Sequence, residues 1–276
     1  MSEPYEFVDV VIDSGTRVAT VTLNRPQKLN AINDQMSAEI DSAFRGIKRN
    51  QDVSVVLLKA AGKSFCAGHD VNEIPHRDPF VESDPWFDEQ KIVFDEIERY
   101  RDLMWSLPQP VIAQVHGHCY TVGVELAMQC DLVYACTDTK MAVRPSGGAA
   151  RYLHMWPWLA GVRKTKELLF TGRLLSGEEL VQFGIANDVF TPEDIDDKVR
   201  AVAEQIARVP LTFLALEKQG LNKCFDLMGV REAVEFSATL HAIGHRTPEG
   251  LAQTAGIYKS DDWREAVRVR DARYAQ

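Results

Sequence analysis

The stretch from Val111 to Asp131, VIAQVHGHCYTVGVELAMQCD, limits the possible fold of this chain more than any other. The apolar run at its start predicts a buried strand, and Gly117 ends that run. Gly123 opens a short apolar helix, and residues 132–135 resume as a strand. The order strand, glycine turn, helix, strand predicts an α/β core around this stretch, and the turn-rich segment 61–71 after the predicted strand at 53–58 is where such a core places a ligand-binding loop.

Glu125 is out of place in the stretch, because its neighbours Val124, Leu126 and Ala127 are apolar. Burying a charged carboxylate is costly unless the group is paired or hydrogen-bonded. One interpretation is therefore a carboxylate that is protonated, bonded or catalytic. The other is a glutamate at a helix start, where the helix macrodipole favours a negative charge. The local sequence is compatible with both.

Composition excludes several classes of function. With 276 residues and 45% hydrophobic content the chain can bury a sizeable core. Its net charge of −9 argues against general binding to nucleic acid or to anionic membrane surfaces. No apolar run reaches the roughly 18 residues of a membrane-spanning helix, and residues 1–20 lack a secretory signal pattern. We therefore expect no nucleic-acid partner and no membrane insertion.

The cysteines and histidines show no pattern of a disulfide framework or a metal site. The five cysteines are odd in number, widely spaced and without C-x-x-C pairing. They are typical of reduced core thiols in a cytoplasmic protein, which is the location we predict. His116 and His118 stand two residues apart and have no third ligand nearby, so we predict no metal site and expect packing or supporting roles for both.

Strand and helix patterns alternate up to residue 190, and only helical patterns follow. Glycine-bearing loops at 61–71 and 144–150 follow predicted strands, and the polar, irregular residues 75–90 are expected to form a flap. We predict two regions. The first is an α/β core at 1–190, and the second is a helical region at 191–276 whose apolar positions are buried between subunits.

Local signals predict where individual elements begin. Asn33 or Asp34 is expected to cap a helix, and Ser176 and Glu179 form a capping-box pattern. The other predicted elements are strands at 8–12, 17–23, 53–58 and 141–143 and helices at 87–105, 151–159, 163–170 and 191–210.

Four segments resemble signature motifs of one family, and the resemblance covers essentially the whole chain. They are VTLNRPQKLNAI at 21–32, SFCAGHDV at 64–71, the stretch at 111–131, and FTGRLLSGEELVQFGIAN at 170–187. The family is the crotonase, or enoyl-CoA hydratase/isomerase, superfamily. The resemblance implies an α/β spiral of ββα units followed by a C-terminal helical trimerisation region, assembled as a homotrimer or a dimer of trimers. It also implies an acyl-CoA thioester of fatty acid metabolism as the substrate, with no cofactor besides the coenzyme A that the substrate carries.

The resemblance assigns roles to residues of two loops. The backbone N–H groups of His69 and Val122 would form an oxyanion hole for the thioester oxygen as it becomes an enolate. A glycine is usual at the Val122 position, and valine there would narrow the pocket. The remaining predicted substrate and coenzyme A contacts are Arg25, Lys28, Asn30, Ala31, Ala67, Gly68, Asp70, Val71, Gly123 and the distant Lys259. Arg25 and Lys28 are expected to meet the phosphates.

The chain departs from the hydratase pattern at one catalytic position. Hydratases of this family use two glutamates; Glu125 matches the first, whereas Ser146 stands where the second is expected. A serine hydroxyl does not transfer protons at neutral pH without an adjacent base. Three interpretations stay open: a hydratase or lyase working mainly through Glu125, an isomerase or thioester or C–C hydrolase with a different acid, and a fatty acyl-CoA binder without chemistry. A different acid could come from the 75–90 flap or from Glu232, Glu235, His241 or His245.

Overall fold

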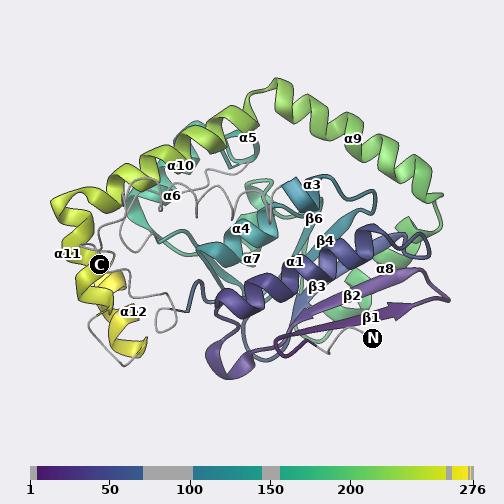
Figure 1. Cartoon of the computed structure of the whole chain (residues 1–276), viewed down its shortest axis with the longest axis horizontal. Coiled ribbons are helices and arrows are strands. Elements are labelled where there is room, and N and C mark those ends of the chain that lie inside the picture. Colours follow the sequence, from purple (N-terminus) through teal and green to yellow (C-terminus); the bar gives the residue numbers. More distant parts are fainter. Residues whose placement is uncertain (1–4, 71–101, 145–155, 259–262, 273, 275–276) are drawn as a thin grey trace.

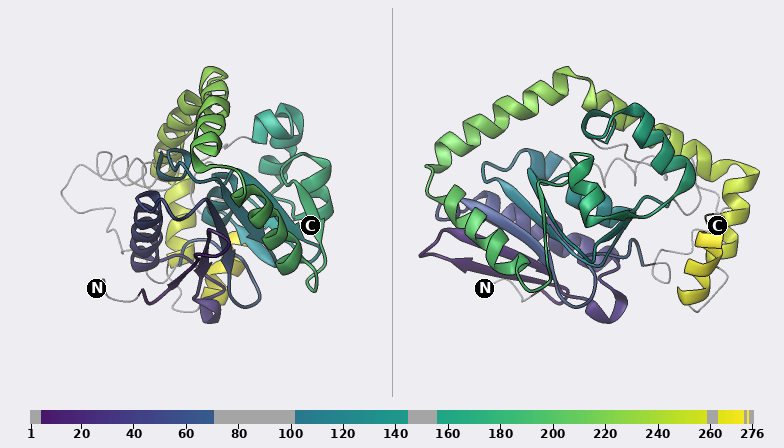
Figure 2. Two further views of the ribbon diagram at one scale, coloured as in Figure 1. Left: turned by 90° about the vertical axis from the view of Figure 1, so that its right-hand side faces the viewer. Right: turned by 180° about the vertical axis from the view of Figure 1, so that it is seen from behind.

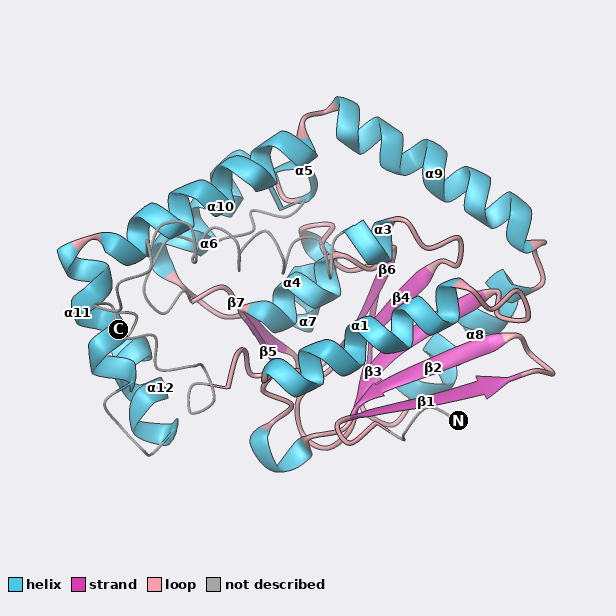
Figure 3. Cartoon of the chain, viewed as in Figure 1, coloured by secondary structure: helices cyan, strands magenta, loops and turns pink. Residues whose placement is uncertain are grey.

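A computed structural model describes residues 5–70, 102–144, 156–258, 263–272 and 274. Its centre is a six-stranded sheet in the order β1-β2-β3-β4-β6-β9 (Figure 1; Figure 3). The strands are β1 (Val8–Asp13), β2 (Val18–Leu23), β3 (Val55–Ala60), β4 (Val111–Val115), β6 (Leu132–Cys136) and β9 (Asp188–Phe190). β1 pairs antiparallel with β2, and each later pair in the sheet is parallel.

A second, three-stranded sheet has the order β5-β7-β8. Its strands are β5 (His118–Tyr120), β7 (Lys140–Ala142) and β8 (Leu175–Ser176). β5 and β7 are parallel, whereas β8 is antiparallel to β7. Because β5 follows β4 after two residues, this sheet begins inside the stretch that the sequence singles out. The sequence did not predict β5, β8 or β9, which are only two or three residues long and carry too little pattern.

Helices surround both sheets. They are η1 (Pro26–Lys28), α1 (Asp34–Lys48), α3 (Leu103–Trp105), α4 (Val122–Met128), α5 (Trp156–Leu159), α6 (Val162–Thr171), α7 (Gly177–Gln182), α8 (Ile195–Ala207), α9 (Leu211–Leu227), α10 (Val230–Arg246), α11 (Pro248–Tyr258) and α12 (Trp263–Ala272). Within the described residues, none of these helices is both long and apolar enough to cross a bilayer.

Both faces of the large sheet are covered. One face packs against α1 and α4, and alternate strand residues such as Val21, Leu58 and Ala113 lie in this larger core. The residues that alternate with these along the strands, such as Leu57 and Ile112, lie on the other face of the sheet and pack against α8 (Figure 2). The central strands β3 and β4 read as nearly continuous apolar runs because both of their faces are covered, whereas Val11 on the edge strand β1 is exposed.

The boundary expected near residue 190 needs one qualification. The first helix after it, α8, buries Ile195, Val199 and Ala203 on the sheet and therefore packs as part of the core. Among the described residues, only helices follow Leu211, and the role of these helices in assembly stays a prediction. The predicted flap at 75–90 lies outside the described residues.

Two helix starts follow the predicted capping chemistry. The side-chain Oδ1 of Asn33 accepts a hydrogen bond from the N–H of Met36 at 2.9 Å, so Asn33 rather than Asp34 is the cap of α1. In α7, Ser176 Oγ accepts from Glu179 N–H at 3.3 Å, and Glu179 Oε2 accepts from Ser176 N–H at 3.0 Å. Both halves of the capping box are confirmed.

Candidate active site

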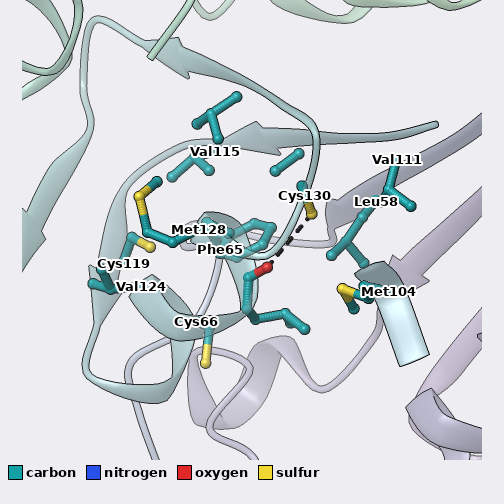
Figure 4. Close-up of a cluster of buried hydrophobic side chains, with 14 of the residues drawn as sticks. Leu58, Phe65, Cys66, Met104, Val111, Val115, Cys119, Val124, Met128 and Cys130 are labelled. Atoms are coloured by element: carbon teal, nitrogen blue, oxygen red, sulfur yellow. Dashed lines mark hydrogen bonds between the residues drawn. The ribbon is translucent and has the colours of Figure 1, made fainter. Parts of the chain in front are cut away.

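Glu125 lies in the first turn of α4 and is only partly buried. The other six residues of this helix are buried against the larger core. Figure 4 shows Val124 and Met128 among these side chains, with the Cys130 thiol donating a hydrogen bond to the carbonyl of Leu126. The apolar neighbours of Glu125 in sequence thus face the core, while Glu125 leaves it on the remaining side of the helix.

The segment from Cys66 to Asp70 lies beside α4. Cys66 forms a parallel bridge with Cys119 of β5: its N–H donates to His118 O at 3.0 Å, and its carbonyl accepts from Tyr120 N–H at 2.9 Å. Burial raises the pKa of the Cys66 thiol to about 12, a hydrogen bond with Gly68 opposes this rise, and the charge of Glu125 adds to it. Glu125 is therefore close enough to this segment to act on it electrostatically.

His69 is placed by a second bridge. Ile32 donates its N–H to the carbonyl of Gly68 and accepts from the N–H of Asp70, both at 2.9 Å. Successive residues of an extended chain present their backbone groups to opposite sides. The residues on either side of His69 form hydrogen bonds with Ile32. The backbone N–H of His69 is therefore directed away from Ile32.

Two glycines allow the His69 segment and the start of α4 to approach closely. A Cβ on Gly123 would lie 2.8 Å from both Cβ and the carbonyl oxygen of Cys66. A Cβ on Gly68, whose φ is +112°, would lie 2.5 Å from Thr121 Oγ1. Side chains larger than hydrogen do not fit at either position. The two segments predicted to carry the oxyanion donors His69 and Val122 are therefore direct neighbours in the fold.

Thr121 joins β5 to α4 in an unusual conformation. Its φ of 46° and ψ of −110° are rare for a β-branched residue, and its side chain does not cap α4. Its N–H donates to the carbonyl of Ala142, at the end of β7, at 3.3 Å. The turn that precedes Val122 is thus held by the second sheet. Sequence analysis did not single out Thr121; threonine beside glycines in an apolar stretch carries no signal of positive φ.

Arg25, which is expected to meet a phosphate, forms an ion pair with Asp70 in the structure. Its guanidinium is buried, and NH1 lies 2.6 Å from Oδ2 of Asp70, with side chains only 5% and 4% exposed. The same nitrogen donates to the carbonyl of Ala31 at 3.0 Å, and the guanidinium carbon lies 5.3 Å from the Phe7 ring centroid. Arg25 and Asp70 therefore hold the loop together, and their contact with a ligand stays a prediction.

Asn30 is also a loop-forming residue. It is fully buried; its Oδ1 accepts from Arg25 N–H, and its Nδ2 donates to the carbonyls of Ala61 and Ser64, each at 2.8 Å. Lys28, Ala31 and Ala67 are half-buried, so Lys28 is the basic residue of this loop that reaches the surface. Three further predicted contacts, Val71, Ser146 and Lys259, lie outside the described residues.

The histidines two residues apart have the supporting roles expected for them. His116 Nε2 lies 3.1 Å from the carbonyl of Gly62, and His118 Nδ1 lies 3.0 Å from the buried Ser64 Oγ. Burial, together with the nearby Lys140 charge, lowers the pKa of His118, which keeps this ring neutral. Among the described residues, no group of three or more His, Cys, Asp or Glu side chains could hold a metal ion.

A cavity of about 530 Å³ lies beside His118. Lys63, Lys140, Ser176 and Glu179 also line it, whereas Glu125, His69 and Val122 do not. Of the C-terminal residues considered as alternative acids, Glu232 and Glu235 are exposed on α10 and His241 is buried, while the side chain of His245 is not described.

Comparison with known proteins shows which proteins this chain resembles as a whole. The family model described as enoyl-CoA hydratase/isomerase matches residues 13–255. A protein of Mycobacterium tuberculosis named as a candidate enoyl-CoA hydratase, EchA13, is 32% identical over 284 residues, which cover 95% of this chain and 89% of that protein. The short-chain-enoyl-CoA hydratase of Clostridium acetobutylicum is 29% identical over 226 residues, with coverage of 79% and 82%.

Solved structures show the same fold. An enoyl-CoA hydratase/isomerase from Xanthobacter autotrophicus Py2 superposes with a TM-score of 0.86 at 26% identity, covering 99% of this chain and all of that one. The expected α/β fold with its C-terminal helical region is confirmed. The match of a family model to most of the chain, the relatives and the shared fold lead to one conclusion: this protein belongs to the enoyl-CoA hydratase/isomerase, or crotonase, family.

Proposed function

We propose that the protein is an enzyme that acts on an acyl-CoA thioester, with the N–H groups of His69 and Val122 binding the thioester oxygen and Glu125 transferring a proton. The observation that supports this most directly is the contact between the 66–70 segment and the start of α4, made possible by Gly68 and Gly123. Two preorganised donors aimed at one oxygen stabilise the charge that develops there, and each is worth about 2.7–4 kcal/mol in measured cases.

Hydration of an enoyl-CoA is the reaction we favour, because two of the relatives above are named enoyl-CoA hydratases. Glu125 takes a proton from water as the hydroxyl bonds to the β-carbon, and the electron pair of the double bond moves toward the thioester oxygen. The enolate is held by the two N–H groups until its α-carbon receives a proton and the carbonyl reforms. The proton that the α-carbon receives is the one that Glu125 took from water, so Glu125 returns to its starting state and one water is added overall.

The test of this proposal is Glu125→Gln, which keeps the side-chain shape and removes the titrating group. Turnover of crotonyl-CoA, followed by loss of ultraviolet absorbance, is expected to fall by about 10²–10⁴-fold. Binding of a saturated acyl-CoA, measured by calorimetry, is expected to stay within a factor of about two, because the substitution keeps the side-chain shape and binding needs no proton transfer. Glu178→Gln is the matched control, since Glu178 is an exposed glutamate in the first turn of α7. Full activity of Glu125→Gln would falsify the assignment.

A second candidate function rests on Ser146, which replaces the carboxylate that hydratases have at this position. Isomerisation or thioester hydrolysis needs the same oxyanion donors but a different arrangement of acids. Mass analysis of the products from a series of acyl-CoA substrates distinguishes hydration, isomerisation and thioester hydrolysis. Ser146→Glu is expected to raise crotonyl-CoA hydration if the hydratase geometry lacks only this carboxylate. Loss of a different wild-type activity in Ser146→Glu supports the second candidate.

Binding of the coenzyme itself is tested without turnover. A ligand that prefers the native state raises the apparent melting temperature, and at 100 times its dissociation constant it adds about 2.7 kcal/mol of stability. Saturating acetyl-CoA is therefore expected to stabilise the protein. Stabilisation with no turnover of any substrate would show a binder without chemistry, and no stabilisation by any acyl-CoA would contradict the proposed substrate class.

A further inference from the structure

Arg144 is held by two distant parts of the chain. Its side chain is 14% exposed, Nε donates to the carbonyl of Gly172 at 2.7 Å, and NH1 donates to Oδ2 of Asp271 at 3.0 Å. Its guanidinium carbon also lies 5.4 Å from the centre of the Tyr274 ring. A largely buried guanidinium with a carboxylate, a carbonyl and an aromatic ring around it has little freedom to move.

Gly172 completes this cluster. It ends α6 in the left-handed conformation, with a φ of 59°, and a Cβ at this position would overlap the Tyr274 ring. The absence of a side chain lets the ring lie directly on the backbone. We call Arg144, Gly172, Asp271 and Tyr274 the Arg144 clamp. Its four members come from three regions of the sequence, and the motifs that resemble the family include only Gly172.

The Arg144 clamp lies next in the chain to the proposed active site. Arg144 follows the last residue of β7, Ala142, by two positions, and it precedes Ser146 by two. Ala142 pairs with Tyr120, and its carbonyl accepts the N–H of Thr121, the residue before Val122. A shift of Arg144 is therefore transmitted through β7 to the turn that carries one proposed oxyanion donor.

We infer that Asp271 and Tyr274 are positioning residues of the thioester site, which hold the end of β7 through Arg144. This inference rests on the proposed function. Neither residue need touch the substrate, because a misplacement of about 1 Å far from the chemistry can lower a rate by about 100-fold. Asp271, on α12, and Tyr274 are thereby part of the catalytic architecture.

The test combines Asp271→Ala and Tyr274→Ala, singly and together, in the full chain. Hydrogen exchange of peptides covering 118–125 and 140–144 is expected to become several-fold faster, because the clamp no longer restrains β7. In the crotonyl-CoA assay, kcat is expected to fall about 10-fold, whereas KM is expected to stay within about 2-fold of the wild-type value. This is the pattern for a change that weakens only interactions made in the transition state, here those of the oxyanion donors. Tyr274→Phe keeps the ring and is expected to behave like the wild type.

Glu265→Gln is the matched control. It removes an exposed ion pair with Arg268 on the same helix, α12, and is expected to change neither exchange nor kcat. Unchanged exchange at both peptides in the double variant overturns the inference whatever the activity is. Faster exchange with unchanged kcat overturns the positioning role and leaves a structural one. A wild-type protein that turns over no acyl-CoA refutes the proposed function and with it the catalytic part of the inference, while the exchange data still decide whether the clamp restrains β7.

Discussion

At the scale of single residues, the structure separates side chains that build the site from those that can react or bind. Arg25 and Asn30 are predicted from the sequence to bind the ligand. In the structure both are buried and form hydrogen bonds within the loop. Glu125, flanked by apolar residues, is partly exposed beside the Cys66–Asp70 segment. The apolar neighbours of Glu125 are buried, whereas its carboxylate keeps partial contact with water. A glutamate in this apolar stretch therefore does not carry the cost of a fully buried charge.

Lys28 and Arg25 are expected to give opposite results on substitution. Lys28→Ala removes a half-exposed cation, so KM for an acyl-CoA should rise about 3–10-fold, equivalent to one weak phosphate contact, with unchanged stability.

Arg25→Met leaves the Asp70 carboxylate buried without its ion-pair partner and should lower the free energy of unfolding by about 3–5 kcal/mol. Steady-state kinetics and urea unfolding check both. A stable Arg25→Met variant with raised KM would restore the phosphate-binding role.

His118 gives a prediction about pH. Its pKa lies below the usual value of 6.5 because burial and the Lys140 charge disfavour the imidazolium. The unfolded chain then binds a proton more readily than the folded one, so this contribution to stability is present above pH 6.5 and is lost as the pH falls through the folded pKa. Nuclear magnetic resonance titration should show the depressed pKa, and Lys140→Gln should raise it. A His118 pKa at or above 6.5 contradicts the prediction.

At the scale of elements, two polar side chains of α9, Lys218 and Asn222, attach this helix to the core. Lys218 Nζ donates to Met104 O at 2.9 Å, to Gln109 O at 3.2 Å and to Asp131 Oδ2 at 2.7 Å. Asn222 adds a hydrogen bond to Trp105 O at 3.1 Å. Asp131 Oδ2 also accepts the N–H of Val111 at 2.7 Å, so the two ends of the Val111–Asp131 stretch are tied to each other and to α9.

Lys218→Met tests this attachment. The change keeps the aliphatic stem but removes the cation from an ion pair whose side chains are 4% and 23% exposed. We expect the free energy of unfolding to fall by about 3 kcal/mol, the lower end of the range for breaking a buried pair, because Asp131 keeps its backbone donor. The double variant Lys218→Met/Asp131→Asn should recover part of the loss in urea unfolding. Asn222→Ala, which removes one neutral hydrogen bond, should cost only about 1 kcal/mol.

At the scale of the whole molecule, α9 and α10 run along one side (Figure 1), and both helices carry exposed apolar side chains. Leu221, Leu227 and Phe236 are 64%, 77% and 65% exposed. Leu214 and Val234, which we also expected at a subunit interface, are instead buried within the chain. An uncovered apolar surface on this scale is typical of protein interfaces, so the predicted homotrimer or dimer of trimers stays our proposal for what covers it.

Sedimentation equilibrium checks this proposal. We expect a particle of at least three times the chain mass of 31.0 kDa at micromolar concentration. Leu221→Asp with Leu227→Asp should shift the distribution toward the monomer, because charges in an apolar interface are costly to desolvate. Val11→Asp, which changes an equally exposed apolar residue on β1, is the control. A wild-type protein that sediments as a monomer contradicts the proposal.

The sequence alone determined the features that depend on neighbours along the chain. The Asn33 cap and the capping box of Ser176 and Glu179 use atoms within three residues of each other, so their patterns were sufficient. The family motifs also identified the fold, because they carry the glycines at 68 and 123 without which the two segments could not touch. Short strands such as β8 were missed because pairing with a distant strand, rather than their own pattern, makes them strands.

Only the tertiary structure decided which charged groups pair with each other. Arg25 meets Asp70 from 45 residues away, Lys218 meets Asp131 from 87, and Arg144 meets Asp271 from 127. No local pattern indicates such partners, since a basic side chain in a loop has the same sequence context whether it is solvated or buried. The difference comes from desolvation: a charge removed from water is stable only where the fold brings an opposite charge and hydrogen-bonding groups to it.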